Sequence, residues 1–158
     1  MKILLIEDDN LYSDELTADL KEDQVISEGG LTVDLVSTER DFRDRFDTLA
    51  KANYDFVIID VMVAWERARP DRRKPDPDVL EGGIYRAGFR CVDMLRRDRR
   101  TQDIPIVVHT NFQEGRPALE LREKYESPLT KFVPKSGDKE PLLASIREWS
   151  LARAQAKS

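Results

Sequence analysis

The sequence contains a single cysteine, Cys91, and a single histidine, His109. One cysteine cannot form an intrachain disulfide, and the lack of Cys and His pairs excludes a structural zinc site. Cys91 falls on the apolar face of a predicted helix, which favours a buried thiol in a reducing compartment. A cytoplasmic location is therefore expected.

Long apolar runs and an excess of basic residues are also missing. No run approaches the ~20 residues of a membrane span, and acidic residues follow Ile6 too soon for a secretory signal. With 26 Lys and Arg against 31 Asp and Glu, the net charge is −5. A nucleic-acid binder would usually carry a basic face. Neither membrane nor nucleic acid is an expected partner.

The composition is that of one compact, highly charged globular domain. The chain has 158 residues, 40% hydrophobic and 36% charged, and domains cluster near ~100 to 150 residues. We expect one core spanning residues 1–150, without a separate output domain. Residues 151–158 are expected to extend the last helix or to fray.

Short apolar runs alternate with longer amphipathic stretches, which is typical of a parallel sheet covered by helices on both faces. The predicted strands are Lys2–Ile6, Leu31–Val36, Phe56–Ile59, Ile104–Val108 and Phe132–Val133. The predicted helices carry Leu11, Leu16 and Leu20; Phe42, Phe46 and Leu49, capped by Thr38 with Asp41; Cys91, Met94 and Leu95; a stretch within Gln113–Tyr125; and Leu142, Leu143, Ile146 and Trp149. The order is (βα)5, an α/β doubly wound fold, which binds ligands at the carboxyl ends of its strands.

Residues Val63–Gly83 interrupt this alternation. The segment holds three prolines, a Gly82-Gly83 pair and ten charged residues, five of each sign, without an apolar period. It is predicted to be a long solvated loop, and loops of this length are usually functional or disordered. Trp65 within it is either a local anchor or a partner contact.

Acidic residues follow two of the predicted strands. Glu7, Asp8 and Asp9 come directly after the first strand, and Asp60 ends the third. If these strands are adjacent, the carboxylates meet, and two like charges ~4 Å apart repel by ~4 kcal/mol at an effective dielectric of ~20. Either a pKa rises or a cation lies between them. Mg²⁺ suits a site with few carboxylates, several waters and a phosphate oxygen.

A hydroxyl and an ammonium belong to the same predicted edge. Thr110 ends the fourth strand and Lys135 follows the fifth. Lysine binds phosphoryl oxygens as a point charge, and threonine can donate a hydrogen bond to the same group. A carboxylate nucleophile, a metal and a cation together favour phosphoryl transfer through an aspartyl phosphate.

With these residues in this order, the chain resembles the receiver domains of response regulators, in particular the single-domain regulators that resemble chemotaxis regulators. The resemblance covers essentially the whole length apart from Val63–Gly83. It is carried in order by Ile3–Asp9, Tyr54–Met62, Ala87–Arg96 with its opening glycine, Asp103–Thr110 and Phe132–Ser136.

The resemblance implies a flavodoxin-like strand order 2-1-3-4-5 and a role for each matching residue. Asp60 would accept the phosphoryl group, and Asp8, Asp60 and the Met62 carbonyl would ligate Mg²⁺, with Glu7 acting through water. Thr110 and Lys135 would hold the phosphoryl group, and Thr110 with Phe132 would form the switch. The implied partners are a histidine kinase or phosphotransfer protein and an unidentified downstream protein, with homodimerisation left open. The chain would catalyse only its own phosphorylation and dephosphorylation, and so is not a metabolic enzyme.

Two other functions stay open. A pseudo-receiver would act only as a phosphorylation-independent interaction module, as the large insertion allows. A phosphohydrolase with an aspartyl intermediate is the other, but Asp60-Val61-Met62 lacks the second acid that such enzymes place two residues later.

Three single residues are interpreted with the strand and charge patterns. His109 should face away from Thr110 toward a helix layer, because side chains alternate along a strand, so a structural role is favoured. Arg67 or Arg69 in the insertion could bond a phosphoryl group on Asp60. The equal numbers of basic and acidic residues slightly favour an inert insertion instead.

Overall fold

The computed structural model describes residues 1–67, 74–83, 86–111 and 122–156. Its elements are β1 (Lys2–Ile6), α1 (Asn10–Glu22), α2 (Gln24–Ser27), β2 (Thr32–Val36), α3 (Glu39–Ala50), β3 (Phe56–Ile59), α4 (Pro77–Gly82), α5 (Ala87–Arg97), β4 (Ile106–Thr110), β5 (Thr130–Pro134) and α7 (Glu140–Ala156). The five strands form one sheet in the order β2-β1-β3-β4-β5, and every pairing is parallel. The predicted doubly wound fold and its strand order are confirmed.

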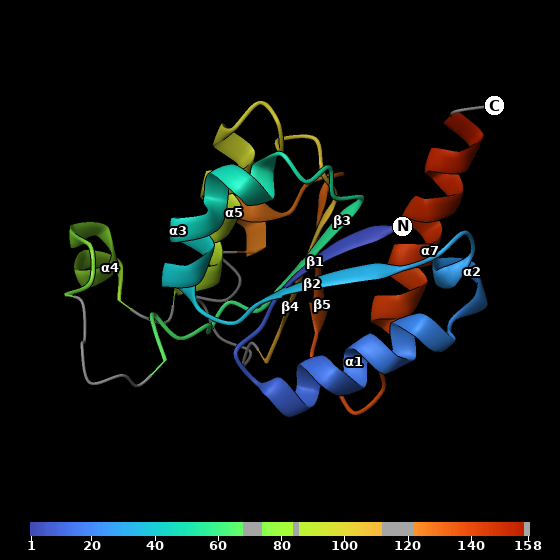
Figure 1. Cartoon of the computed structure of the whole chain (residues 1–158), viewed down its shortest axis with the longest axis horizontal. Coiled ribbons are helices and arrows are strands. Elements are labelled where there is room, and N and C mark those ends of the chain that lie inside the picture. Colours follow the sequence, from blue (N-terminus) through green and yellow to red (C-terminus); the bar gives the residue numbers. More distant parts are fainter. Residues whose placement is uncertain (68–73, 84–85, 112–121, 157–158) are drawn as a thin grey trace.

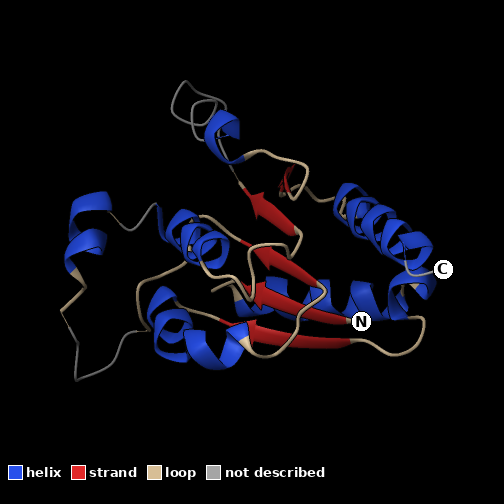
Figure 2. Ribbon diagram, turned by 90° about the horizontal axis from the view of Figure 1, so that it is seen from above, coloured by secondary structure: helices blue, strands red, loops and turns tan. Residues whose placement is uncertain are grey.

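The sheet is buried on both faces, because successive strand residues point to opposite sides. Ile3 and Leu5 of β1 pack with α1, α2 and α7, whereas Leu4 and Ile6 pack with α3 and α5. Figures 1 and 2 show these two helix layers on either side of the strands. Within the described ranges, no helix combines the length and apolar character needed to cross a bilayer.

Side-chain caps set the start of α1, which follows the acidic residues after β1, and the start of α3, which connects β2 to β3. The Asp9 carboxylate accepts a hydrogen bond from Tyr12 N at 3.0 Å and begins α1. The predicted Thr38 cap is confirmed, because Thr38 Oγ1 accepts from Asp41 N at 3.0 Å. Such caps satisfy backbone N–H groups that have no partner inside the helix.

Several predicted boundaries are corrected. Strand β4 runs over Ile106–Thr110 rather than 104–108, and β5 extends from Thr130 to Pro134 around the predicted pair. Leu11, one of the three leucines that predict the first helix, is 71% exposed and is not part of the core. The short helix α2 was not predicted. The predicted helix within Gln113–Tyr125 lies largely outside the described residues, of which 122–125 are helical.

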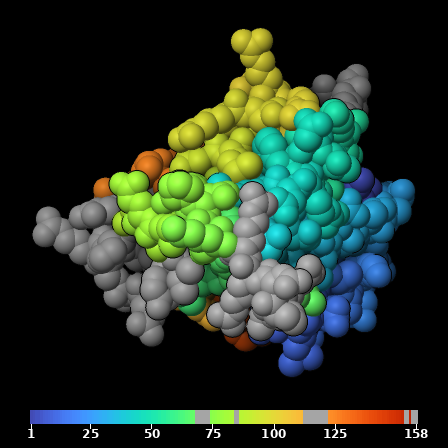
Figure 3. All heavy atoms as spheres, turned by 60° about the vertical axis from the view of Figure 1, so that its left-hand side comes forward, coloured from blue at the N-terminus to red at the C-terminus, as the bar shows by residue number. Residues whose placement is uncertain are grey.

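The insertion after β3 is predicted to be a long solvated loop, but the structure shows a helix within it. The six-residue helix α4 begins at Pro77. Proline is tolerated in the first turn of a helix, because a backbone N–H there has no partner inside the helix. Val63, Trp65 and Val79 are buried. Backbone hydrogen bonds join its first part to α3, from Glu39 N to Ala64 O and from Arg40 N to Trp65 O, each at 2.9 Å. The described part of the insertion therefore packs against the domain, and Figure 3 shows the atoms of α4 beside α3 and α5.

Trp65 is the anchor of this segment, one of the two roles left open for it. Its side chain is buried, and the Arg43 guanidinium lies 5.7 Å from the indole ring centroid. A cation over a ring face is attracted by the ring's electrons.

Cys91 is free and fully buried in the core, as predicted, and burial raises the pKa of its thiol.

Candidate functional site

Parallel pairing brings the acidic residues to one edge of the sheet. Ile6 of β1 is in register with Ile59 of β3, so Glu7 and Asp60 follow neighbouring strand ends. Asp60 N donates to Ile6 O at 2.9 Å. One carboxylate oxygen from each of Glu7, Asp8 and Asp60 lies within 4.8 Å of the others. This set of oxygen donors suits a hard divalent cation.

Lys135 lies between two of these carboxylates. Its ammonium is 2.6 Å from Glu7 Oε2 and 2.6 Å from Asp60 Oδ2, with 10% of its side chain exposed. The Lys135 backbone N donates to Thr110 O at 3.1 Å, which places the lysine just beyond β5. The ammonium therefore offsets the repulsion between the two buried acids.

Both oxygens of Asp60 accept hydrogen bonds. Thr110 Oγ1 donates to Oδ1 at 2.7 Å, Met62 N donates to the same oxygen at 3.1 Å, and Lys135 donates to Oδ2. Asp60 and Thr110 are both buried. The predicted acceptor, hydroxyl and cation thus meet on one carboxylate, while the Met62 side chain points to solvent and is 51% exposed.

The environment separates the pKa values of the two buried acids. Burial raises the pKa of Asp60, but the hydrogen bonds from Lys135 and Thr110 outweigh it, so the pKa lies below its ordinary value. Burial dominates at Glu7 and raises its pKa despite Lys135. Burial lowers the pKa of Lys135, and its bonds to the two acids raise it by more. Asp60 is consequently the more acidic of the two buried carboxylic acids.

The other acidic residues bind backbone at the mouth of the site. Asp8 is exposed, and its Oδ2 accepts from Ala64 N at 3.0 Å, which connects the site to the start of the insertion. Asp9 caps α1, while its own N–H donates to Glu7 Oε1 at 3.1 Å.

Arg67, one of the two arginines of the insertion expected near the site, donates to Asn10 Oδ1 and Ser37 Oγ at 3.0 and 2.9 Å. Arg69 lies outside the described residues.

Gly88, near the start of α5, packs directly on the backbone that carries Asp60. A Cβ at this position would lie 2.2 Å from Asp60 O and 2.7 Å from Val61 Cα, and Gly88 N donates to Val61 O at 3.0 Å. Only glycine permits this approach.

Gly88→Ala is therefore expected to destabilise the fold by about 1–3 kcal/mol or more, because the added methyl group must displace backbone. Urea unfolding measures the loss. Gly137→Ala is the matched control, since a Cβ there meets nothing within 4 Å. Equal stability of the two variants would contradict the close packing of α5 on Asp60.

His109 and Phe132 lie beside the site. His109 faces the helix layer of α1 as predicted, where its Nε2 is hydrogen-bonded to the Tyr12 hydroxyl. Tyr12 was not singled out from the sequence, although its position three residues after the Asp9 cap places it near the acidic edge. Phe132, predicted as a switch residue, is half-buried, with its ring centroid 6.3 Å from that of Phe89.

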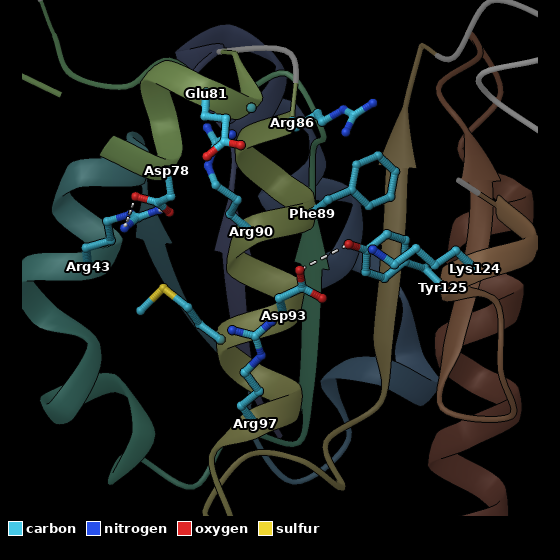
Figure 4. A pocket seen from close by; sticks show the side chains of 12 residues that line it. Arg43, Asp78, Glu81, Arg86, Phe89, Arg90, Asp93, Arg97, Lys124 and Tyr125 are labelled. Carbon is cyan, nitrogen blue, oxygen red and sulfur yellow. Dashed lines mark hydrogen bonds and ion pairs between the residues drawn. The ribbon is translucent and has the colours of Figure 1, made fainter. Parts of the chain in front are cut away.

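A separate pocket of about 770 Å³ lies between α4, α5 and the segment before β5. Figure 4 shows Arg43 paired with Asp78 on one wall and Asp93 bonded to Tyr125 on the other. The acidic cluster of Glu7, Asp8 and Asp60 does not line it. The insertion thus contributes Asp78, Glu81 and Gly82 to a mixed-charge cavity that is distinct from the acidic cluster.

No protein-family model matches the chain, and no curated protein matches it. Solved structures do. The signal receiver domain of a two-component histidine kinase from Clostridium thermocellum matches with a TM-score of 0.65 and 16% identity, covering 94% of this chain and 96% of its own. The HemR receiver domain from Leptospira biflexa matches with a TM-score of 0.59 and 20% identity, over 94% and 93%.

The receiver domain of the sensor histidine kinase PA1611 from Pseudomonas aeruginosa is a third match, with a TM-score of 0.58 and 16% identity over 94% of this chain and 96% of that one. That structure is described with a magnesium ion coordinated in its active-site cleft. These matches cover nearly the whole chain. The chain therefore has the fold of a response-regulator receiver domain.

Proposed function

We propose that the chain is a phospho-accepting signalling switch in which Asp60 receives a phosphoryl group. The observation that carries this proposal is the convergence of Thr110 and Lys135 on the buried Asp60 carboxylate, beside Glu7 and Asp8. An ionised carboxylate with a hydroxyl donor and an ammonium at hand has the groups that phosphoryl transfer requires.

In the proposed step, a carboxylate oxygen of Asp60 attacks phosphorus and forms an O–P bond. The bond between phosphorus and the donor's leaving group breaks, and the leaving group keeps the electron pair. Lys135 and Thr110 already touch Asp60, so they can transfer their hydrogen bonds to the phosphoryl oxygens. The chain would catalyse only this reaction on itself and the later hydrolysis, in which water attacks phosphorus, the bond to Asp60 breaks, and inorganic phosphate leaves.

The cluster of oxygen donors fits a resident Mg²⁺. Asp8, Asp60 and the Met62 carbonyl would hold the ion, with Glu7 acting through water. When bound, it supplies positive charge that offsets the crowded carboxylates and the phosphoryl oxygens. Lys135, which now bridges Glu7 and Asp60, would share that task.

Acetyl phosphate tests the proposal. Incubation with acetyl phosphate and Mg²⁺ is expected to add one phosphoryl group, detected as a single increment in intact mass. Added EDTA should suppress the increment. A wild-type chain that binds Mg²⁺, as titration would show, yet stays unmodified contradicts the proposal.

That outcome would favour the second candidate, an interaction module that works without phosphorylation. The observation in its favour is the insertion, which is packed against α3 and bonded to Asp8 through Ala64 N. Under the first proposal, a cytoplasmic histidine kinase or phosphotransfer protein would be the donor. A downstream protein would read the state of Thr110 and Phe132.

The phosphorylated form is expected to be long-lived. In the family that the chain resembles, the side chains two residues after the acceptor and two after the threonine can orient the attacking water. Here they are Met62 and Phe112, which are apolar and cannot do so; Phe112 lies outside the described residues. Met62→Gln introduces a polar side chain at the exposed position and should shorten the half-life of the phosphoryl group severalfold. Mass spectrometry over time measures the decay. A half-life of seconds in the wild-type chain, without a phosphatase, would count against this prediction.

A further inference from the structure

Tyr12 connects Lys135 to a buried histidine. The Lys135 ammonium lies 4.6 Å from the centroid of the Tyr12 ring, and the Lys139 ammonium lies 5.5 Å from it. The Tyr12 hydroxyl is hydrogen-bonded to His109 Nε2, and His109 Nδ1 is 2.9 Å from Val133 O. None of these contacts is needed to build the acidic cluster itself.

The hydrogen-bond partners determine the proton positions in this chain. A backbone carbonyl only accepts, so His109 Nδ1 carries the hydrogen and donates it to Val133 O. Nε2 of the neutral ring is then the acceptor, and the Tyr12 hydroxyl donates to it. Burial lowers the pKa of His109, which favours this neutral form. The Tyr12 hydroxyl thus has one defined orientation.

The other end of Tyr12 is held by the acidic loop. Tyr12 N donates to Asp9 Oδ1 at 3.0 Å, and Asp9 N donates to Glu7 Oε1 at 3.1 Å. Tyr12 is therefore fixed at its backbone by Asp9 of the acidic loop, and at its hydroxyl by His109, which is bonded in turn to Val133 of β5. A ring held in this way cannot swing aside when Lys135 moves.

Lys135 needs such a support. Two of its three donors are directed at Glu7 and Asp60. The Tyr12 ring lies against the same ammonium, where an aromatic face attracts a cation most when both are shielded from water. On phosphorylation, the ammonium has to change from a carboxylate oxygen to a phosphoryl oxygen without leaving the site.

We propose that Tyr12 is a positioning residue for Lys135 and that His109 anchors Tyr12, a role that rests on the proposed function. The ring keeps the ammonium at the sheet edge before and after the phosphoryl group arrives. Tyr12 itself does not contact the reacting atoms. Tyr12 and His109 would thus connect helix α1 to the lysine that takes part in phosphorylation.

The test compares initial rates of phosphorylation by acetyl phosphate at saturating Mg²⁺. Tyr12→Leu removes the ring and is expected to slow the rate about tenfold. Tyr12→Phe keeps the ring but loses the hydroxyl bond to His109, so its rate should fall between that of the wild type and that of Tyr12→Leu. Mg²⁺ affinity should change less than about twofold in both variants. Leu11→Ala, exposed in the same helical turn, is the control and should match the wild type.

A double-mutant cycle with Lys135→Gln separates positioning from a general effect on the fold. If Tyr12 acts through Lys135, Tyr12→Leu has no further effect on the residual rate in the Lys135→Gln background. An additional tenfold loss there, or a wild-type rate for Tyr12→Leu alone, overturns the inference while leaving the proposed function intact. An unmodified wild-type chain overturns both.

Discussion

Asp60→Asn is expected to abolish phosphoryl incorporation from acetyl phosphate. The asparagine amide has nearly the shape of the carboxylate but has no anionic oxygen to attack phosphorus. Of the three clustered acids, Asp60 is the one that accepts hydrogen bonds from both Thr110 and Lys135, so neither Glu7 nor Asp8 is expected to replace it. Intact mass after incubation with acetyl phosphate and Mg²⁺ should therefore show no increment.

Asp14→Asn is the matched control, because Asp14 is an exposed carboxylate of α1 away from the cluster. This variant should be phosphorylated like the wild type. Circular dichroism should show that Asp60→Asn remains folded, since Lys135 keeps its ion pair with Glu7. A full phosphoryl increment on Asp60→Asn would exclude Asp60 as the acceptor and direct attention to the other acids.

Glu39→Gln is expected to destabilise the fold strongly, because it removes the charge from a buried ion-pair network. The fully buried Glu39 carboxylate lies 2.7 Å from Arg43 Nη2 and 2.6 Å from Arg90 Nη2. Without its charge, two largely buried guanidinium groups lose their common partner. Breaking a buried pair by removing one partner costs about 3–5 kcal/mol. Arg43 retains Asp78 at 2.5 Å, so the lower end of that range is expected.

Urea unfolding followed by circular dichroism measures this loss. The control on the same helix is Asp41→Asn, because Asp41 forms an exposed ion pair with Arg45 at 3.2 Å. Exposed pairs contribute at most about 1 kcal/mol. Equal midpoints for the two variants would show that the buried network adds no stability. Arg90 also donates to Gly83 O at 2.8 Å, so the loss should also loosen the end of α4.

The bounds of β4 show how much of a strand the apolar pattern predicts. Predicted β4 began at Ile104, but the described strand begins at Ile106, because Ile104 N closes a turn with Thr101 O and Pro105 has no N–H for the ladder. At its other end, β4 includes the polar His109 and Thr110. They pair with Val133 and Pro134 and extend the ladder beyond the apolar run that ends at Val108.

The helix α4 shows the opposite limit of sequence reasoning. Its segment has no apolar period, and Val79 is its one buried hydrophobic residue. Asp78 pairs with Arg43 of α3, and the backbone of Gly83 accepts from Arg90 of α5. Both partners are distant in sequence, so local pattern predicts only a solvated loop there.

The sequence by itself determined the (βα)5 order and the polar residues at the strand ends, because buried strands and amphipathic helices are encoded locally by apolar spacing. Parallel pairing then necessarily directs Glu7, Asp60, Thr110 and Lys135 to one edge. Only the tertiary structure decided that Lys135 bridges Glu7 and Asp60, that Tyr12 lies between this lysine and His109, and that Glu39 is buried with two arginines. These contacts join residues far apart in the chain, and their energies depend on the distance and burial of each charge, which no local pattern contains.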